Sequence, residues 1–97
     1  MLIITALMKV KKGKANEFEK AARKYAPLFL KDPGCAMYHV HQRLDNPEIF
    51  LFYEQYENKE ALKYHVQSAT FKDMKAATDP LLDGEPEIFR YKDILRS

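Results

Sequence analysis

Apolar positions recur along the chain with two different periods, and the period changes at each turn signal. Residues 2–10 are apolar at nearly every position, which is typical of a strand covered on both faces. After the turn Lys11-Lys12-Gly13, apolar residues recur at alternating steps of three and four, as on one helix face: Ala15, Phe18, Ala22, Tyr25 and Phe29. We expect Pro27 to kink or end the regular helix near its last turn, and Asp32-Pro33-Gly34 to stop it.

A second strand, a hairpin turn and a third strand follow. Residues 35–44 are predicted to form the second strand, and Asp45-Asn46-Pro47-Glu48 is a turn of hairpin length. Residues 49–57 include large apolar side chains at both even and odd positions, so this third strand presents them to both faces of a sheet.

The last third of the chain predicts a broken helix and a fourth strand. Asn58 is a favourable N-cap for a helix over about residues 59–67. Thr70-Phe71-Lys72-Asp73 has the spacing of a capping box, which predicts a short second helix near residues 71–78. After a turn, residues 87–95 alternate as a strand.

The order strand, helix, strand, strand, helix, strand is the split β-α-β pattern of a ferredoxin-like α+β fold. It predicts a four-stranded antiparallel sheet with helices on one face, within one domain covering residues 1–97. Because the strands are apolar on both parities, the uncovered face would be an apolar patch larger than monomers usually expose. We therefore expect a homodimer joined sheet to sheet.

Composition excludes several classes of function. Sixteen basic and 14 acidic side chains leave a net charge of +2, so nothing calls for a nucleic-acid partner. The first apolar run is too short for a membrane span and lacks the flanks of a signal peptide, which favours a cytoplasmic protein. The single cysteine, Cys35, fits a reducing compartment. The three glycines stand singly at turns, so no dinucleotide or phosphate loop is expected.

Candidate chemistry is concentrated between residues 52 and 72. Glu54 and Tyr56 share a strand face, while His65 and Ser68 share a helix face, so the two pairs converge if this helix lies on the sheet. An imidazole titrates near neutral pH, which suits His65 to the role of general base. The alternative is that His65 is a buried histidine with a structural partner, and that Glu54 is that partner.

Other polar side chains have two interpretations each. Tyr38, Tyr53 and Tyr56 offer hydroxyls to a substrate, or they are core aromatics. Ser68 contacts a substrate, or it caps a helix. His39 and His41 share a strand face and suit a metal only if a third ligand lies opposite, so no metal site is expected.

Several short motifs together resemble the antibiotic biosynthesis monooxygenase family, and the resemblance covers nearly the whole chain. They are Gly34-Cys35 with Tyr38, Glu54-x-Tyr56, Asn58-x-Glu60-Ala61, His65-x-x-Ser68 and Phe71. The resemblance implies a dimeric αβ-barrel and an attack of O2 on a quinol or polyketide-like aromatic without flavin, metal or other cofactor. For this chemistry the candidate catalytic residues are His65, Glu54 and Tyr56, and the candidate substrate-binding residues are Tyr38, Tyr53, Ser68 and Phe71.

The chain departs from the family pattern at two positions. Tyr56 stands where members often have Trp, and Thr70 stands where they often have a second His. The Glu-x-Tyr form resembles a branch that isomerises a phosphorylated signalling ketose, which would need a phosphate anchor such as Lys72, Lys75 or Arg43. A non-catalytic dimer that binds a small molecule is the third interpretation, because this fold does not dictate chemistry.

Overall fold

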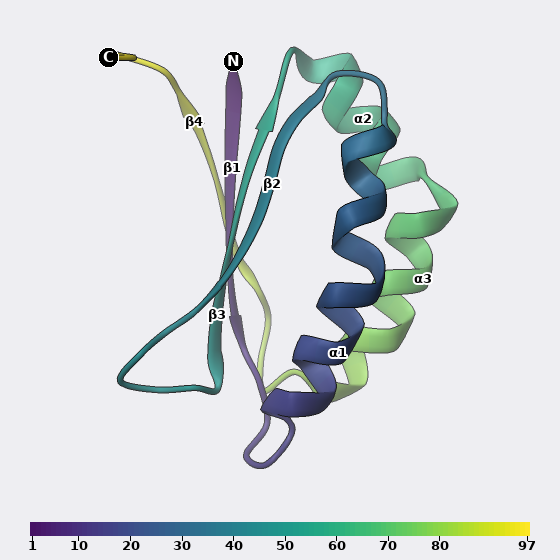
Figure 1. Ribbon diagram of the computed structural model, residues 1–97, viewed down its shortest axis with the longest axis vertical. Helices are drawn as coiled ribbons and strands as arrows, with labels where there is room; N and C mark the ends of the chain where they lie inside the picture. The colour runs from purple at the N-terminus through teal and green to yellow at the C-terminus, as the bar shows by residue number, and fades with distance from the viewer.

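The computed structural model describes residues 1–97 and contains four strands, three α-helices and two 3-10 helices. In chain order they are β1 (Leu2–Lys9), α1 (Ala15–Tyr25), η1 (Ala26–Lys31), β2 (Cys35–Gln42), β3 (Ile49–Tyr56), α2 (Lys59–Gln67), α3 (Ala69–Thr78), η2 (Asp79–Leu81) and β4 (Glu87–Lys92). The strands form one sheet in the order β2-β3-β1-β4, and every neighbouring pair is antiparallel. The helices lie on one face of this sheet (Figure 1). The predicted ferredoxin-like fold is therefore confirmed.

The strand register places one row of side chains across the sheet. Glu54 on β3 is paired with Ile4 on β1 and with Tyr38 on β2, while Ile4 is also paired with Arg90 on β4. Residues paired across antiparallel strands point to the same face. Four strands thus bring an acid, a phenol and a guanidinium to one level of the helix-covered face.

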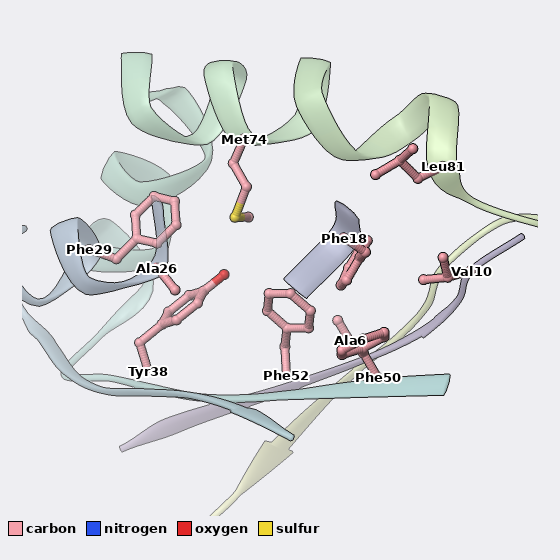
Figure 2. Close-up of a cluster of buried hydrophobic side chains, with 10 residues drawn as sticks. All are labelled: Ala6, Val10, Phe18, Ala26, Phe29, Tyr38, Phe50, Phe52, Met74 and Leu81. Carbon is pink, nitrogen blue, oxygen red and sulfur yellow. The ribbon is translucent and has the colours of Figure 1, made fainter. Parts of the chain in front are cut away.

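The core lies between this face and the helices, and its centre is aromatic. Phe18 of α1 is completely buried, and its ring centroid lies 4.6 Å from that of Phe50 and 6.1 Å from that of Phe52. Figure 2 shows these rings between the sheet and Met74 of α3. Full burial of one such side chain contributes about 1.5–3 kcal/mol. The core therefore packs α1 and α3 against the sheet. The cluster drawn in Figure 2 contains no residue of α2, the helix that carries His65.

The opposite face of the sheet has no helix over it. Its side chains alternate with those of the core, and several large ones are exposed: Leu51 (38%), Phe89 (55%) and Tyr91 (49%). Leu7 lies across from Leu51 in the β1–β3 register. This exposed apolar surface agrees with the sequence, in which the strands have apolar residues at both even and odd positions.

The turn after η1 brings the chain close to α2. Regular helix ends at Tyr25, and the chain continues as η1 with Pro27 in its first turn, as predicted. Gly34 then adopts φ +80°, and a Cβ there would lie 2.5 Å from the Cβ of Ala61. Only glycine accommodates both the positive φ and this contact. Asp32, two residues earlier, is thereby held near α2.

β2 and β3 end at Gln42 and Tyr56, slightly before the predicted ends at residues 44 and 57, and two further boundaries differ for local reasons. Helix α3 begins at Ala69 with Ser68 as its N-cap, because the Ser68 hydroxyl accepts a 3.1 Å bond from the Phe71 amide. The capping box predicted at Thr70 is not used. β4 ends at Lys92 instead of Leu95, because Lys92 is paired with Leu2, where β1 begins.

None of the helices combines the length and the apolar composition needed to cross a membrane.

Candidate functional site

A cavity of about 560 Å³ lies between the sheet and the helices α2 and α3. Ten of its 19 lining residues are hydrophobic, among them Phe52, Phe71 and Met74. The buried titratable groups at its wall are Glu54, His65 and Tyr38. A mainly apolar cavity of this size with a few polar groups is typical of a small-molecule site.

Glu54 is buried in this wall and has one firm hydrogen-bond partner. The hydroxyl of Tyr56 donates to its Oε1 at 2.6 Å. Burial raises the pKa of Glu54 from 4.5 to about 7, although the bond from Tyr56 acts in the opposite direction. A carboxyl with a pKa near neutrality can both accept and release a proton under physiological conditions.

His65 projects from α2 into a cage of aromatic rings. The centroid of its ring lies 4.4 Å from that of Phe29 and 5.0 Å from that of Phe71. Its Nε2 lies 3.7 Å from Glu54 Oε1. Burial lowers the pKa of His65 from 6.5 to about 4, so the ring is neutral at physiological pH. The predicted convergence of strand and helix therefore does bring His65 beside Glu54.

Asp32 lies on the other side of the imidazole. Its Oδ2 is 4.0 Å from His65 Nδ1, and both atoms are buried without a hydrogen-bond partner. Burial raises the pKa of this carboxyl. Asp32 was not predicted from the sequence as a site residue, since the Asp-Pro-Gly motif indicated only the end of a helix. The sequence feature that could have indicated Asp32 is its position, as an acidic residue in the turn just before the strand that carries Tyr38.

Tyr38 and Phe71 both line the cavity. Figure 2 shows the Tyr38 side chain rising from the sheet with its hydroxyl directed toward the helices. Burial raises the pKa of Tyr38 well above 10, so its hydroxyl remains protonated and available as a donor.

Three predicted site residues do not line the cavity. Tyr53 lies on the opposite face of the sheet, because its odd position in β3 separates it from Glu54 and Tyr56. Tyr53 therefore faces away from this cavity. Tyr56 is completely buried and reaches the cavity only through Glu54. Ser68 uses its hydroxyl within the helix, where it donates to the His65 carbonyl and caps α3.

Basic side chains at the cavity were also not predicted in this arrangement. Lys59 and Lys63 of α2 and Arg90 of β4 line it and have no ion-pair partner within the chain. Lys75 lines it too, but its Nζ lies 2.7 Å from Asp79 Oδ2. Lys59 and Lys63 are four residues apart and so share one helix face.

The sequence matches the family model described as antibiotic biosynthesis monooxygenase over residues 1–77. The chain belongs to this family. It is 30% identical to the uncharacterised protein sll1783 of Synechocystis over 94% of the present chain and 62% of that protein. The chain thus spans less than two thirds of that relative. It is 26% identical to YcnE of Bacillus subtilis, provisionally named a monooxygenase, over 93% of this chain and 95% of YcnE.

Solved structures of the antibiotic biosynthesis monooxygenase family have the same fold. A Nitrosomonas europaea protein, provisionally named an antibiotic biosynthesis monooxygenase, superimposes with a TM-score of 0.94. The match covers 98% of this chain and 100% of that one at 20% identity. At this identity the likeness concerns the fold, and the chemistry of this family member has to be argued from its own cavity.

His39 and His41 stand apart from the cavity. Both lie on the uncovered sheet face, with ring centroids 5.9 Å apart. No group of three or more His, Cys, Asp or Glu side chains is arranged to hold a metal ion. Of the two departures from the family pattern, Tyr56 is the donor to Glu54, and Thr70 is half-buried in the first turn of α3.

Proposed function

We propose that this family member is a cofactor-independent monooxygenase that acts on a quinol or a similar hydroxylated aromatic. The observation that supports this most is the Glu54–His65 pair, buried in the wall of a mainly apolar cavity. An aromatic substrate is favoured by the rings of Tyr38, Phe52 and Phe71 along the same cavity. The provisional name of YcnE, a relative of similar length, points the same way.

The proposed reaction begins with loss of a proton from the substrate hydroxyl. The neutral imidazole of His65, or the ionised form of Glu54, accepts this proton. The resulting quinolate is electron-rich enough to pass an electron to O2, and the two radicals combine at a ring carbon. Loss of water then leaves a hydroxyquinone. The sum is quinol plus O2 to hydroxyquinone plus water, so the substrate supplies every electron and no external reductant is consumed.

The basic side chains at the cavity support a substrate that becomes an anion. Lys59, Lys63 and Arg90 would stabilise a quinolate and the superoxide formed next to it. The isomerase interpretation has less support, because two of its three candidate phosphate anchors, Lys72 and Arg43, do not line the cavity, and the third, Lys75, lines it but is paired with Asp79. Arg43 instead lies 3.9 Å from Asp45 in the hairpin turn.

We propose a homodimer as the working assembly, with no nucleic-acid or membrane partner. The support is the exposed apolar face that includes Leu51, Phe89 and Tyr91. A second copy placed face to face would cover it with the same residues, as a two-fold interface requires.

The test is oxygen consumption with quinols of one and two rings. We expect His65→Ala to lower the rate by about 10²–10⁴-fold while the protein stays folded. Tyr64→Ala, on the exposed side of α2 and outside the cavity lining, is the control and should retain the rate. Wild-type protein that consumes no oxygen with any quinol but isomerises a phosphorylated ketose would replace this proposal with the isomerase. Saturable binding of quinols without turnover would replace it with the binding-protein interpretation.

A further inference from the structure

Two buried polar atoms lack a hydrogen-bond partner, and they face each other. They are Oδ2 of Asp32 and Nδ1 of His65, 4.0 Å apart. Native proteins pair nearly all such groups, so an unpaired couple calls for an explanation. The 4.0 Å separation is longer than a hydrogen bond, but an approach of about 1 Å would let a proton on one atom satisfy both, because the protonated atom becomes a donor to the other.

Aromatic rings from two elements pack against the imidazole of His65. Phe29 and Phe71 pack edge-on against the ring, with interplanar angles of 70° and 73°. With Nδ1 toward Asp32, the opposite nitrogen Nε2 is the one that lies 3.7 Å from Glu54. The imidazole thus lies between two carboxyl groups, one from the turn before β2 and one from β3.

The other titratable groups near this centre stay neutral. Burial raises the pKa of Cys35 to about 11, and burial raises those of Tyr38 and Tyr56 well above their ordinary values. Phe71 of α3 presents an uncharged ring. The titratable groups nearest His65 that can change charge are therefore Asp32 and Glu54, while Lys59, Lys63 and Arg90 add positive charge along the cavity.

We propose that Asp32 is a positioning residue that accepts a hydrogen bond from Nδ1–H of His65 and so leaves Nε2 unprotonated toward Glu54. The carboxyl of Asp32 selects the tautomer, as a carboxylate does for the histidine of a hydrolytic triad. A proton taken up from the cavity side enters at Nε2. The imidazolium then has a carboxyl group beside each N–H, which favours its formation.

The catalytic use of this arrangement rests on the proposed function, but the tautomer exists without substrate. ¹⁵N–¹H correlation spectra of histidine-labelled protein at pH 7 distinguish the two tautomers directly, and His39→Gln and His41→Gln identify the signals of the other two rings. We expect the Nδ1–H tautomer for His65. An Nε2–H tautomer in the wild-type protein overturns the proposal, whatever any variant does.

Variants at position 32 test the cause. Asp32→Ala removes the acceptor, so we expect His65 to change to the Nε2–H tautomer. Asp32→Asn keeps an oxygen acceptor but loses the charge, so we expect His65 to become protonated at a lower pH than in the wild-type protein. Asp73→Asn, on the exposed side of α3, is the control and should change neither. Unchanged tautomer and unchanged titration in the Asp32 variants would contradict the proposal.

Turnover separates this inference from the proposed function. With a quinol that the wild-type protein oxidises, Asp32→Asn should lower kcat by about 10²-fold or more and leave KM within about threefold, because Asp32 does not line the cavity. A rise in KM at unchanged kcat would contradict a positioning role. If no quinol is oxidised, the oxygenase proposal fails, while the tautomer measurement still decides the role of Asp32.

Discussion

The hydroxyl of Tyr56 donates a 2.6 Å hydrogen bond to Glu54, its neighbour on the same face of β3. Tyr56 is completely buried, whereas Glu54 lines the cavity. The bond favours the ionised carboxylate, against the larger effect of burial. Tyr56 therefore does not line the cavity, but its hydrogen bond lowers the pKa of Glu54, which does.

Tyr56→Phe should raise the pKa of Glu54 further above 7, because it removes the one hydrogen bond that lowers it. It should also cost about 1–2 kcal/mol of unfolding free energy, since a buried acceptor loses its donor. Urea denaturation at pH 8 measures the cost. Tyr64→Phe is the matched control, because Tyr64 is half exposed on α2. Equal stability of the two variants would show that the bond does not contribute.

Glu54 and His65 should give opposite pH dependences of stability. Between pH 4.5 and about 7, folded Glu54 holds a proton that the unfolded chain has released, so stability falls as pH rises. Between about pH 4 and 6.5, unfolded His65 holds a proton that the folded protein lacks, so stability rises with pH. Each slope reaches at most about 1.4 kcal/mol per pH unit, so the two cancel where they overlap.

Glu54→Gln should expose the contribution of His65. We expect its unfolding free energy, measured in urea from pH 7 to pH 4, to decrease more steeply than that of the wild-type protein. The difference should approach about 1 kcal/mol per unit below pH 6.5. Glu85→Gln, in the exposed turn before β4, should follow the wild-type curve. A Glu54→Gln curve parallel to wild type would mean that the two groups do not titrate as burial requires.

The fold was predictable because each helix and strand has its own spacing of apolar residues and is bounded by recognisable turn or cap residues. The helix stripe from Ala15 to Phe29, the Asn58 cap and the turn at Pro47 each agree with the structure. Strand alternation also placed Glu54 and Tyr56 on one face, and the same alternation places Tyr53 on the other. Strand alternation was thus the most reliable guide to which side chains meet.

The missing parts of the site depend on tertiary contacts that no local pattern contains. Arg90 reaches the cavity because β4 pairs with β1 and places it across from Ile4. Asp32 reaches His65 because Gly34 allows its turn to contact Ala61 of α2. Neither the strand order nor the approach of a turn to a helix follows from the residues nearby. Hence the pair Glu54–His65 was foreseen and the flanking groups were not.

The basic side chains at the cavity should favour anionic ligands. Lys63→Gln and Arg90→Gln should each weaken binding of 2-naphthoate by about two- to fivefold at low salt, and hardly affect the neutral 2-naphthalenemethanol. The difference should shrink above about 0.5 M salt, where exposed charges are screened. Lys72→Gln is the control, since Lys72 does not line the cavity. Titration calorimetry with both ligands measures the effect, and equal losses for the two would contradict it.

The break between α2 and α3 should depend on Ser68 and not on Thr70. Ser68→Ala removes the hydroxyl that accepts the Phe71 amide, so we expect a loss of about 1 kcal/mol in unfolding free energy. Thr70→Ala should stay within about 0.5 kcal/mol of the wild-type value. Thermal and urea unfolding of both variants decide between the two caps. A larger loss for Thr70→Ala would restore the capping box predicted from the sequence.

Leu51→Glu should convert the proposed dimer to a monomer. Leu51 lies near the middle of the uncovered face, across from Leu7, and a carboxylate there would be buried without a partner between two sheets. Light scattering after size exclusion should give twice the chain mass for the wild-type protein and the single-chain mass for the variant.

Leu30→Glu tests whether that effect belongs to the sheet face. Leu30 is more exposed than Leu51, at 54% against 38%, but it lies on η1, on the helical side of the molecule. Its replacement should therefore leave the dimer intact. If the wild-type protein has the single-chain mass at micromolar concentration, the sheet face is open in solution and the dimer proposal fails. If both variants dissociate, the interface includes the helical side.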